Sequence, residues 1–135
     1  LRHDFKIRRV LESGARCNKL LINIALPDAG SCLYQAGYIT DADLVRLREN
    51  RAVGSICCRF FDESGRPCDE TLDGRTLGIS IEDIRRADCV MACITGRQKA
   101  QAIYSALRNE LIDILVIDSL TAEEIMRIAE AERSA

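Results

Sequence analysis

Two apolar runs, each followed by a helical pattern, place the strongest constraint on the fold of this chain. Residues 89–94 and 112–117 are almost entirely aliphatic or sulfur-containing, and each has the length of a strand. Apolar side chains at both odd and even positions are typical of parallel strands that helices cover on both faces. A strand–helix–strand–helix order predicts parallel pairing through right-handed crossovers. The sequence therefore predicts an α/β domain with a three-layer arrangement around a parallel sheet.

Turn residues, apolar periodicity and helix caps predict the remaining elements. Thr40 with Asp43, and Ser80 with Asp83, have the spacing of capping boxes. Residues 52–61 are expected to form one strand, although the turn that follows leaves room for a hairpin. Further strands are expected at residues 20–26 and 76–79, and helices at residues 1–13, 41–49, 81–86, from 97 onward and from 121 onward.

Composition and charge are those of an ordinary globular chain. Of 135 residues, 47% are hydrophobic and 30% charged, which predicts one domain and argues against disorder. The 19 basic and 21 acidic residues give a net charge of −2, so no broad basic surface for nucleic acid or a membrane is expected. Without a bilayer-length apolar run or an export signal, a cytoplasmic location is expected. Because Leu1 already lies in a helical pattern, the chain is expected to be part of a longer protein.

Seven cysteines require an explanation. They are Cys17, Cys32, Cys57, Cys58, Cys68, Cys89 and Cys93. The chain has no C-x-x-C pair and a single histidine, His3, remote from every cysteine, so neither a metal site nor a cofactor is expected. Most cysteines lie in apolar runs, where the thiol behaves as a small hydrophobe, so buried and reduced thiols are predicted. The alternative is an exposed reactive thiol at Cys17 or Cys68.

The segment from Thr95 to Lys99 is the main candidate for a binding site. It follows the strand predicted at residues 89–94, and ligands of open parallel sheets bind beyond the carboxyl ends of the strands. Gly96 allows close backbone approach, the helix start offers free N–H groups, and Arg97 and Lys99 add positive charge. This combination favours a small anion, phosphate above all. The alternative is a tight turn with two solvated cations, since neither the P-loop nor the dinucleotide motif is present.

Two further places could contact a ligand. Asp118 follows the strand predicted at residues 112–117, where it could accept hydrogen bonds from sugar hydroxyls or cap the next helix. Gly54 and Ser55 interrupt an apolar strand, which indicates close approach of a ligand or a bulge. No catalytic site is predicted, because the single histidine lies near the N-terminus and the carboxylates are scattered.

Several segments together resemble the SorC-type bacterial transcriptional regulators, a sugar-binding family. The stretch AVGSICCRFFDESG at residues 52–65 resembles the family pattern AVGDI-x-x-RFFD-x-x-G. GRQKAQAI at residues 96–103 is similar to GG-x-x-K-x-x-AI. Similar agreement is found in GYI at residues 37–39, RTLGIS at 75–80, IDILVID at 112–118 and TA at 121–122. The resemblance extends from about Leu20 to the C-terminus.

The resemblance implies a fold, a function and a set of partners. Such regulators join an N-terminal helix-turn-helix domain to an effector domain similar in fold to sugar-phosphate isomerases. Residues 1–135 would be the C-terminal portion of that effector domain, so operator DNA would be contacted only through a domain absent from this chain. The effector domain binds a phosphorylated sugar or a related metabolite, which alters oligomerisation and DNA binding. Homo-oligomers are therefore expected, with no membrane partner.

The resemblance also assigns residues, with some departures. Lys99, Gly96 and the Gly54–Ser55 region match positions at the family's ligand site. Ser55 stands where an aspartate is usual, Thr95 replaces a glycine, and residues 26–28 replace a glycine-rich turn, so a polyol or unphosphorylated sugar is an alternative effector. The complete set of predicted ligand-binding residues is Gly54, Ser55, Thr95, Gly96, Arg97, Lys99 and Asp118. An isomerase or deaminase-like enzyme and a ligand-free oligomerisation module are the alternative functions.

Overall fold

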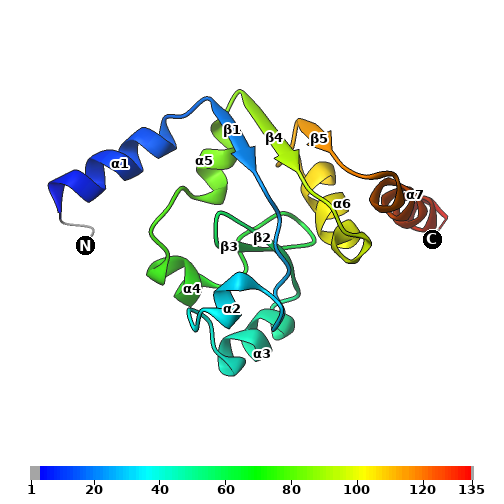
Figure 1. The fold of residues 1–135 in the computed structure, drawn as a ribbon, viewed down its shortest axis with the longest axis horizontal. Coiled ribbons are helices and arrows are strands. Elements are labelled where there is room, and N and C mark those ends of the chain that lie inside the picture. Colours follow the sequence, from blue (N-terminus) through cyan, green and yellow to red (C-terminus); the bar gives the residue numbers. More distant parts are fainter. Residues whose placement is uncertain (1–3, 135) are drawn as a thin grey trace.

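A three-stranded parallel sheet forms the centre of the computed structural model, which describes residues 4–134 (Figure 1). Its strands are β1 (Lys19–Ile22), β4 (Cys89–Cys93) and β5 (Ile114–Val116), in the order β1-β4-β5. Leu21 lies opposite Met91, which in turn lies opposite Ile114, and both pairs of strands are parallel. The predicted α/β class and parallel sheet are confirmed.

One face of this sheet carries the main hydrophobic core. It is covered by α5 (Ile81–Arg86), α6 (Ala100–Arg108) and α7 (Ser119–Arg133). Val90 and Ala92 point from β4 into this core, and both are at most 2% exposed. Ile103 of α6 and Ile84 of α5 are fully buried against them. Burial of this aliphatic surface is the main source of stability.

The opposite face of the sheet is open in the part of the chain that the structure describes. Leu21 is 73%, Val116 53% and Ile114 41% exposed, and all three alternate with core residues along their strands. Helix α1 (Phe5–Ala15) extends away from the sheet and has no buried residue (Figure 1). The expectation that helices cover both faces thus holds for one face only among the described residues.

A second, smaller unit is inserted between β1 and β4. It contains α2 (Cys32–Gln35), α3 (Asp41–Glu49), the antiparallel strands β2 (Ala52–Ile56) and β3 (Arg59–Asp62), and α4 (Glu70–Arg75). Its own core consists of Ile39, Leu47, Phe60 and Leu72. Two backbone hydrogen bonds between Ala25 and Ser55, of 2.9 and 3.1 Å, attach the hairpin to the segment that follows β1.

The predicted single strand at residues 52–61 is wrong, because the chain reverses within it. Cys57 and Cys58 form the turn of the β2–β3 hairpin, with φ values of 51° and 62°. Two successive residues with positive φ match the twist of a two-residue hairpin turn, but this conformation usually requires glycine or asparagine. Two cysteines inside an apolar stretch therefore gave no sign of a turn.

The strand predicted at residues 76–79 is also absent, and Arg59 explains why. This buried side chain, 7% exposed, donates hydrogen bonds to four backbone carbonyls, at 2.7 to 3.3 Å. The acceptors belong to Asp73, Thr76, Gly78 and Ile79. Because these carbonyls bond to the Arg59 guanidinium, they do not bond to a neighbouring strand, and residues 76–79 form no strand among the described residues.

Local helix signals were more reliable. Both predicted capping boxes are present, at Thr40 and at Ser80, and the helices begin where they were expected. The last helix begins at Ser119, two residues before its predicted start, because Asp118 provides the cap. The predicted N-terminal helix is confirmed from Phe5, whereas its first three residues, including His3, lie outside the described residues.

The prediction of buried cysteines is wrong. Five are exposed, and Cys68 and Cys89 are only half-buried. Cys57 and Cys58 occupy the hairpin turn, and Cys93 lies on the open face of the sheet. Burial, followed by nearby carboxylates, raises the pKa of Cys68 to about 12, which disfavours it as a reactive thiol. Among residues 4–134, no cluster of histidine, cysteine and carboxylate side chains could hold a metal, and no helix could cross a membrane.

Candidate functional site

The carboxyl ends of β1 and β4 border a cavity of about 320 Å³, here called the strand-end pocket. Figure 1 shows the two strands side by side and running in the same direction, so the segments that follow them begin at the same edge of the sheet. The pocket is lined by Asn23, Ala25, Leu26, Asp28, Gly30, Ser31, Cys32, Gln98 and Lys99. This is the edge at which open parallel sheets bind ligands, and the candidate segment 95–99 reaches it through Gln98 and Lys99.

The loop after β1 is held by its own hydrogen bonds. Asp28 accepts one from the Gly30 N–H through Oδ1, at 2.9 Å, and its carbonyl accepts one from the Ser31 N–H, at 3.1 Å. Ser31 then caps α2, and the Gln35 amide donates to the Ala29 carbonyl, at 2.7 Å. The loop is thereby ordered, while Oδ2 of Asp28 has no hydrogen-bond donor within residues 4–134.

Lys99 contributes the positive charge of the pocket. It lies at the end of the 3₁₀ turn η1 (Arg97–Lys99), just before α6, and its side chain is half-buried. Its backbone N–H donates to the Gly96 carbonyl at 2.9 Å, which fixes the turn. In the part of the chain that the structure describes, its ammonium has no ion pair or hydrogen bond. A half-buried cation without a partner is available to a ligand.

Gly54 and Ser55 lie behind the pocket and do not line it. Ser55 is 4% exposed, and its backbone pairs with Ala25, which does line the pocket. A Cβ at Gly54 would lie 2.9 Å from the Cβ of Ala102 and 3.0 Å from Phe61. Glycine is therefore required because the hairpin packs closely on α6, which supports the pocket wall indirectly.

The other predicted residues form a separate cluster beside the pocket. Asp118 accepts hydrogen bonds from the Thr121 hydroxyl, at 2.6 Å, and from the Thr121 N–H, at 2.9 Å, which lower the pKa of Asp118. Gly96, at φ 117°, donates its N–H to the same hydroxyl, at 3.0 Å. Arg97 contacts Glu124 at 3.3 Å, and Thr95 is exposed. These interactions join the β4 turn to the start of α7.

Of the seven residues predicted to bind a ligand, only Lys99 lines the strand-end pocket. The polar lining residues that sequence reasoning did not identify are Asn23, Asp28, Ser31 and Cys32, whereas Gln98 lay within the candidate segment without an assigned role. A usable signal is present, since residues 27–30 have the composition of a turn and directly follow the strand predicted at residues 20–26. In a parallel sheet that turn must lie at the same edge as the turn containing Lys99.

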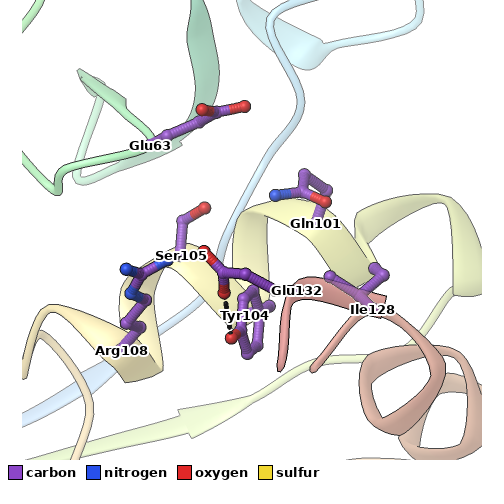
Figure 2. Close-up of a pocket in the computed structure, with 7 residues that line it drawn as sticks. All are labelled: Glu63, Gln101, Tyr104, Ser105, Arg108, Ile128 and Glu132. Atoms are coloured by element: carbon purple, nitrogen blue, oxygen red, sulfur yellow. Dashed lines mark hydrogen bonds and ion pairs between the residues drawn. The ribbon is translucent and has the colours of Figure 1, made fainter. Parts of the chain in front are cut away.

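A second cavity, of about 240 Å³, lies between α6, α7 and the turn after β3 and is here called the interhelical pocket (Figure 2). It is lined by Glu63, Gln101, Tyr104, Ser105, Arg108, Ile128 and Glu132. Tyr104 donates a hydrogen bond to Glu132, and Arg108 forms an ion pair with the same carboxylate. The hydrogen bond and then the arginine lower the pKa of Glu132, while the bond raises the pKa of Tyr104.

Known proteins match this chain over most of its length. Residues 1–127 match the family described as "Putative sugar-binding domain". The Deoxyribonucleoside regulator of Bacillus subtilis (strain 168) is 30% identical over 123 residues, which cover 91% of this chain and 39% of the relative.

Solved structures show the same fold. A DeoR family transcriptional regulator from Listeria monocytogenes has a TM-score of 0.87 and 31% identity, over 92% of this chain and 50% of that one. A transcriptional regulator from Streptococcus pneumoniae TIGR4 has a TM-score of 0.85 and 26% identity, over 96% of this chain and 49% of that one. The chain therefore spans about half the length of these solved chains.

Proposed function

Because the chain belongs to the sugar-binding domain family of SorC/DeoR transcriptional regulators, we propose that its strand-end pocket binds the effector of such a regulator. The effector would be a sugar, a sugar phosphate or a polyol. The observation that carries this proposal is the ammonium of Lys99, which has no partner within residues 4–134 and lines a cavity at the edge where parallel sheets bind ligands.

Effector binding would act on transcription by shifting a conformational equilibrium. The loop after β1 lines the pocket and is bonded to β2 through Ala25 and Ser55, so movement of the loop would be transmitted to the inserted unit. Operator DNA would be contacted by a helix-turn-helix domain elsewhere in the cytoplasmic parent protein, which would act as a homo-oligomer. The greater length of the relatives supports this organisation.

The same length difference bears on the open face of the sheet. This chain covers about half of each solved relative, so about half of each relative lies outside the matched region. Additional chain packed on Leu21, Ile114 and Val116 would complete the three-layer arrangement of sugar-phosphate isomerases. Those three exposed aliphatic side chains are the feature that supports this part of the proposal.

An enzymatic role is not favoured. The matching relatives described above are transcriptional regulators and not enzymes. In this proposal the pocket binds its ligand without converting it, and the consequence of binding is conformational.

A thermal-shift titration of the protein tests the proposal. The ligands would be D-sorbitol, 2-deoxy-D-ribose and their phosphate esters, with product analysis of the same samples. A ligand at 100 times its dissociation constant adds about 2.7 kcal/mol of stability, which raises the melting temperature measurably. Stabilisation that is lost in Lys99→Ala and kept in Arg108→Ala, without turnover, supports effector binding at the strand-end pocket.

Other results of this titration would contradict the proposal. Turnover of a stabilising ligand would indicate an enzyme. The absence of any shift with all ligands would instead favour a ligand-free oligomerisation module. A loss of stabilisation in Arg108→Ala with none in Lys99→Ala would move the site to the interhelical pocket, which contains Arg108.

A further inference from the structure

Resting on the proposed function, we infer that the strand-end pocket selects a neutral polyhydroxylated ligand, a free sugar or polyol, over the corresponding phosphate ester. The sequence alone favoured phosphate, because Gly96, Arg97 and Lys99 are adjacent in the chain. In the structure only Lys99 of these three residues lines the pocket, and the carboxylate of Asp28 lines it as well.

The first observation is that two of the three anion-binding features are already used within the protein. Arg97 lies outside the pocket lining and contacts Glu124, at 3.3 Å. The N–H of Gly96 donates to the Thr121 hydroxyl, at 3.0 Å. Phosphate is commonly held by backbone N–H groups at a helix start together with Arg or Lys side chains. Of the side-chain cations at this turn, only Lys99 reaches the pocket.

The second observation is the carboxylate of Asp28, which lines the same pocket. Its Oδ1 fixes the loop through Gly30, whereas Oδ2 has no donor among the described residues. With Lys99, the lining has one formal positive and one formal negative charge, which cancel. Asp28 is exposed, so solvent screens part of its charge, but a phosphate dianion would still meet a like charge there, whereas a neutral ligand would leave the balance unchanged.

The third observation is the hydrogen-bonding chemistry of the lining. Asn23 and Gln98 present amides that both donate and accept, Asp28 accepts, and Lys99 donates. A hydroxyl group also donates and accepts, so a polyol can satisfy all four side chains. The volume of about 320 Å³ is at the lower end of the range for small-molecule pockets, roughly 300–1,000 Å³.

Matched ligand pairs test this inference by isothermal titration calorimetry. The pairs are D-sorbitol with D-sorbitol 6-phosphate, and 2-deoxy-D-ribose with its 5-phosphate, each measured at low and at high salt. We expect the neutral member of the better-binding pair to bind at least about tenfold more tightly, with an affinity that hardly depends on salt.

Asp28→Asn is the decisive variant. It keeps an oxygen for the Gly30 hydrogen bond and removes only the charge, so it should narrow or reverse the preference by improving binding of the phosphate ester. Glu63→Gln makes the same charge change at the exposed rim of the interhelical pocket and should leave the preference unaltered.

The possible failures are distinguishable. Equal affinity, or tighter binding of the phosphate ester by the unmodified protein, overturns the inference and leaves the proposed effector site in place. An unchanged preference in Asp28→Asn overturns the role of the carboxylate and with it the inference. If no member of either pair binds, both the inference and the proposed function fail.

Discussion

The strand-end pocket and the interhelical pocket are similar in size and differ in how their charged groups are used. The strand-end pocket, of about 320 Å³, contains Lys99 and the free oxygen of Asp28, neither of which has a partner among the described residues. In the interhelical pocket, of about 240 Å³, Arg108 and Tyr104 both contact Glu132 (Figure 2).

This difference is the basis for proposing a binding site in one pocket and a structural junction in the other. Both linings contain charged and amide side chains, so residue types alone do not distinguish them. A polar group that is already paired gains little from a ligand, because it would exchange one hydrogen bond for another. A half-buried cation without a protein partner gives up no protein contact when it binds a ligand. The availability of polar groups is therefore a better indicator of function than the residue types of the lining.

The largest expected effect comes from Arg59, which bonds β3 to α4 and to the segment that follows it. Arg59→Ala would remove a donor from four backbone carbonyls, of which that of Asp73 keeps a second one, the Thr76 N–H at 3.2 Å, so the expected cost is about 3 kcal/mol in the free energy of unfolding. Urea denaturation would measure this loss. Hydrogen exchange should accelerate in β2, β3 and the loop after β1, while α6 and α7 stay protected. Uniform acceleration would show that the pockets are not independent.

Gly54→Ala should have a smaller effect, and it tests why this residue is a glycine. The added methyl would lie 2.9 Å from the Cβ of Ala102, so a loss of about 2 kcal/mol in stability is expected from overpacking. Thermal denaturation measures the loss, and effector affinity of the folded fraction should change little. A stable variant with abolished binding would mean that Gly54 contacts the ligand directly.

Lys99→Ala tests the difference between the pockets, because it should change effector affinity and leave stability unchanged. We expect at least about tenfold weaker binding of the effector, about 1.4 kcal/mol, with an unchanged melting temperature in its absence. Arg108→Ala is the matched control, because it removes a paired cation from the interhelical pocket. Equal losses of effector affinity in the two variants would contradict the distinction between the two pockets.

The smallest expected effect depends on pH and concerns Tyr104 and Glu132. The folded-state pKa of Glu132 is lowered, so its contribution to stability is present above the ordinary pKa of a glutamate and is lost as pH falls through the folded value. Tyr104→Phe should therefore destabilise the protein slightly at neutral pH and hardly at all in acid. Denaturation midpoints across that range measure the difference, and a constant difference would contradict the assignment.

Much of the fold could be predicted from local patterns. The apolar runs of β4 and β5, the caps at Thr40 and Ser80, and the parallel order of the C-terminal strands depend on neighbouring residues only, and all are present. The β2–β3 hairpin was missed, because its turn consists of two cysteines in a conformation that cysteine rarely adopts.

The candidate site was predictable in position but not in composition. The carboxyl edge of the sheet follows from strand order alone, and Lys99 lies there. Arg97 is two residues away in sequence, yet it contacts Glu124, 27 residues further on. Asp28 precedes Lys99 by 71 positions, yet both line one pocket. No local pattern encodes either pairing.

Local sequence patterns are sufficient to predict the α/β class, the parallel strands, the helix caps and the sheet edge of the candidate site. These features arise from side-chain periodicity and from hydrogen bonds over a few residues. Which charged groups remain available depends on the folded arrangement, because ion pairs and hydrogen bonds between distant segments form when packing brings their partners together. That arrangement left Lys99 and Asp28 facing one pocket and occupied Arg97 and Asp118 elsewhere.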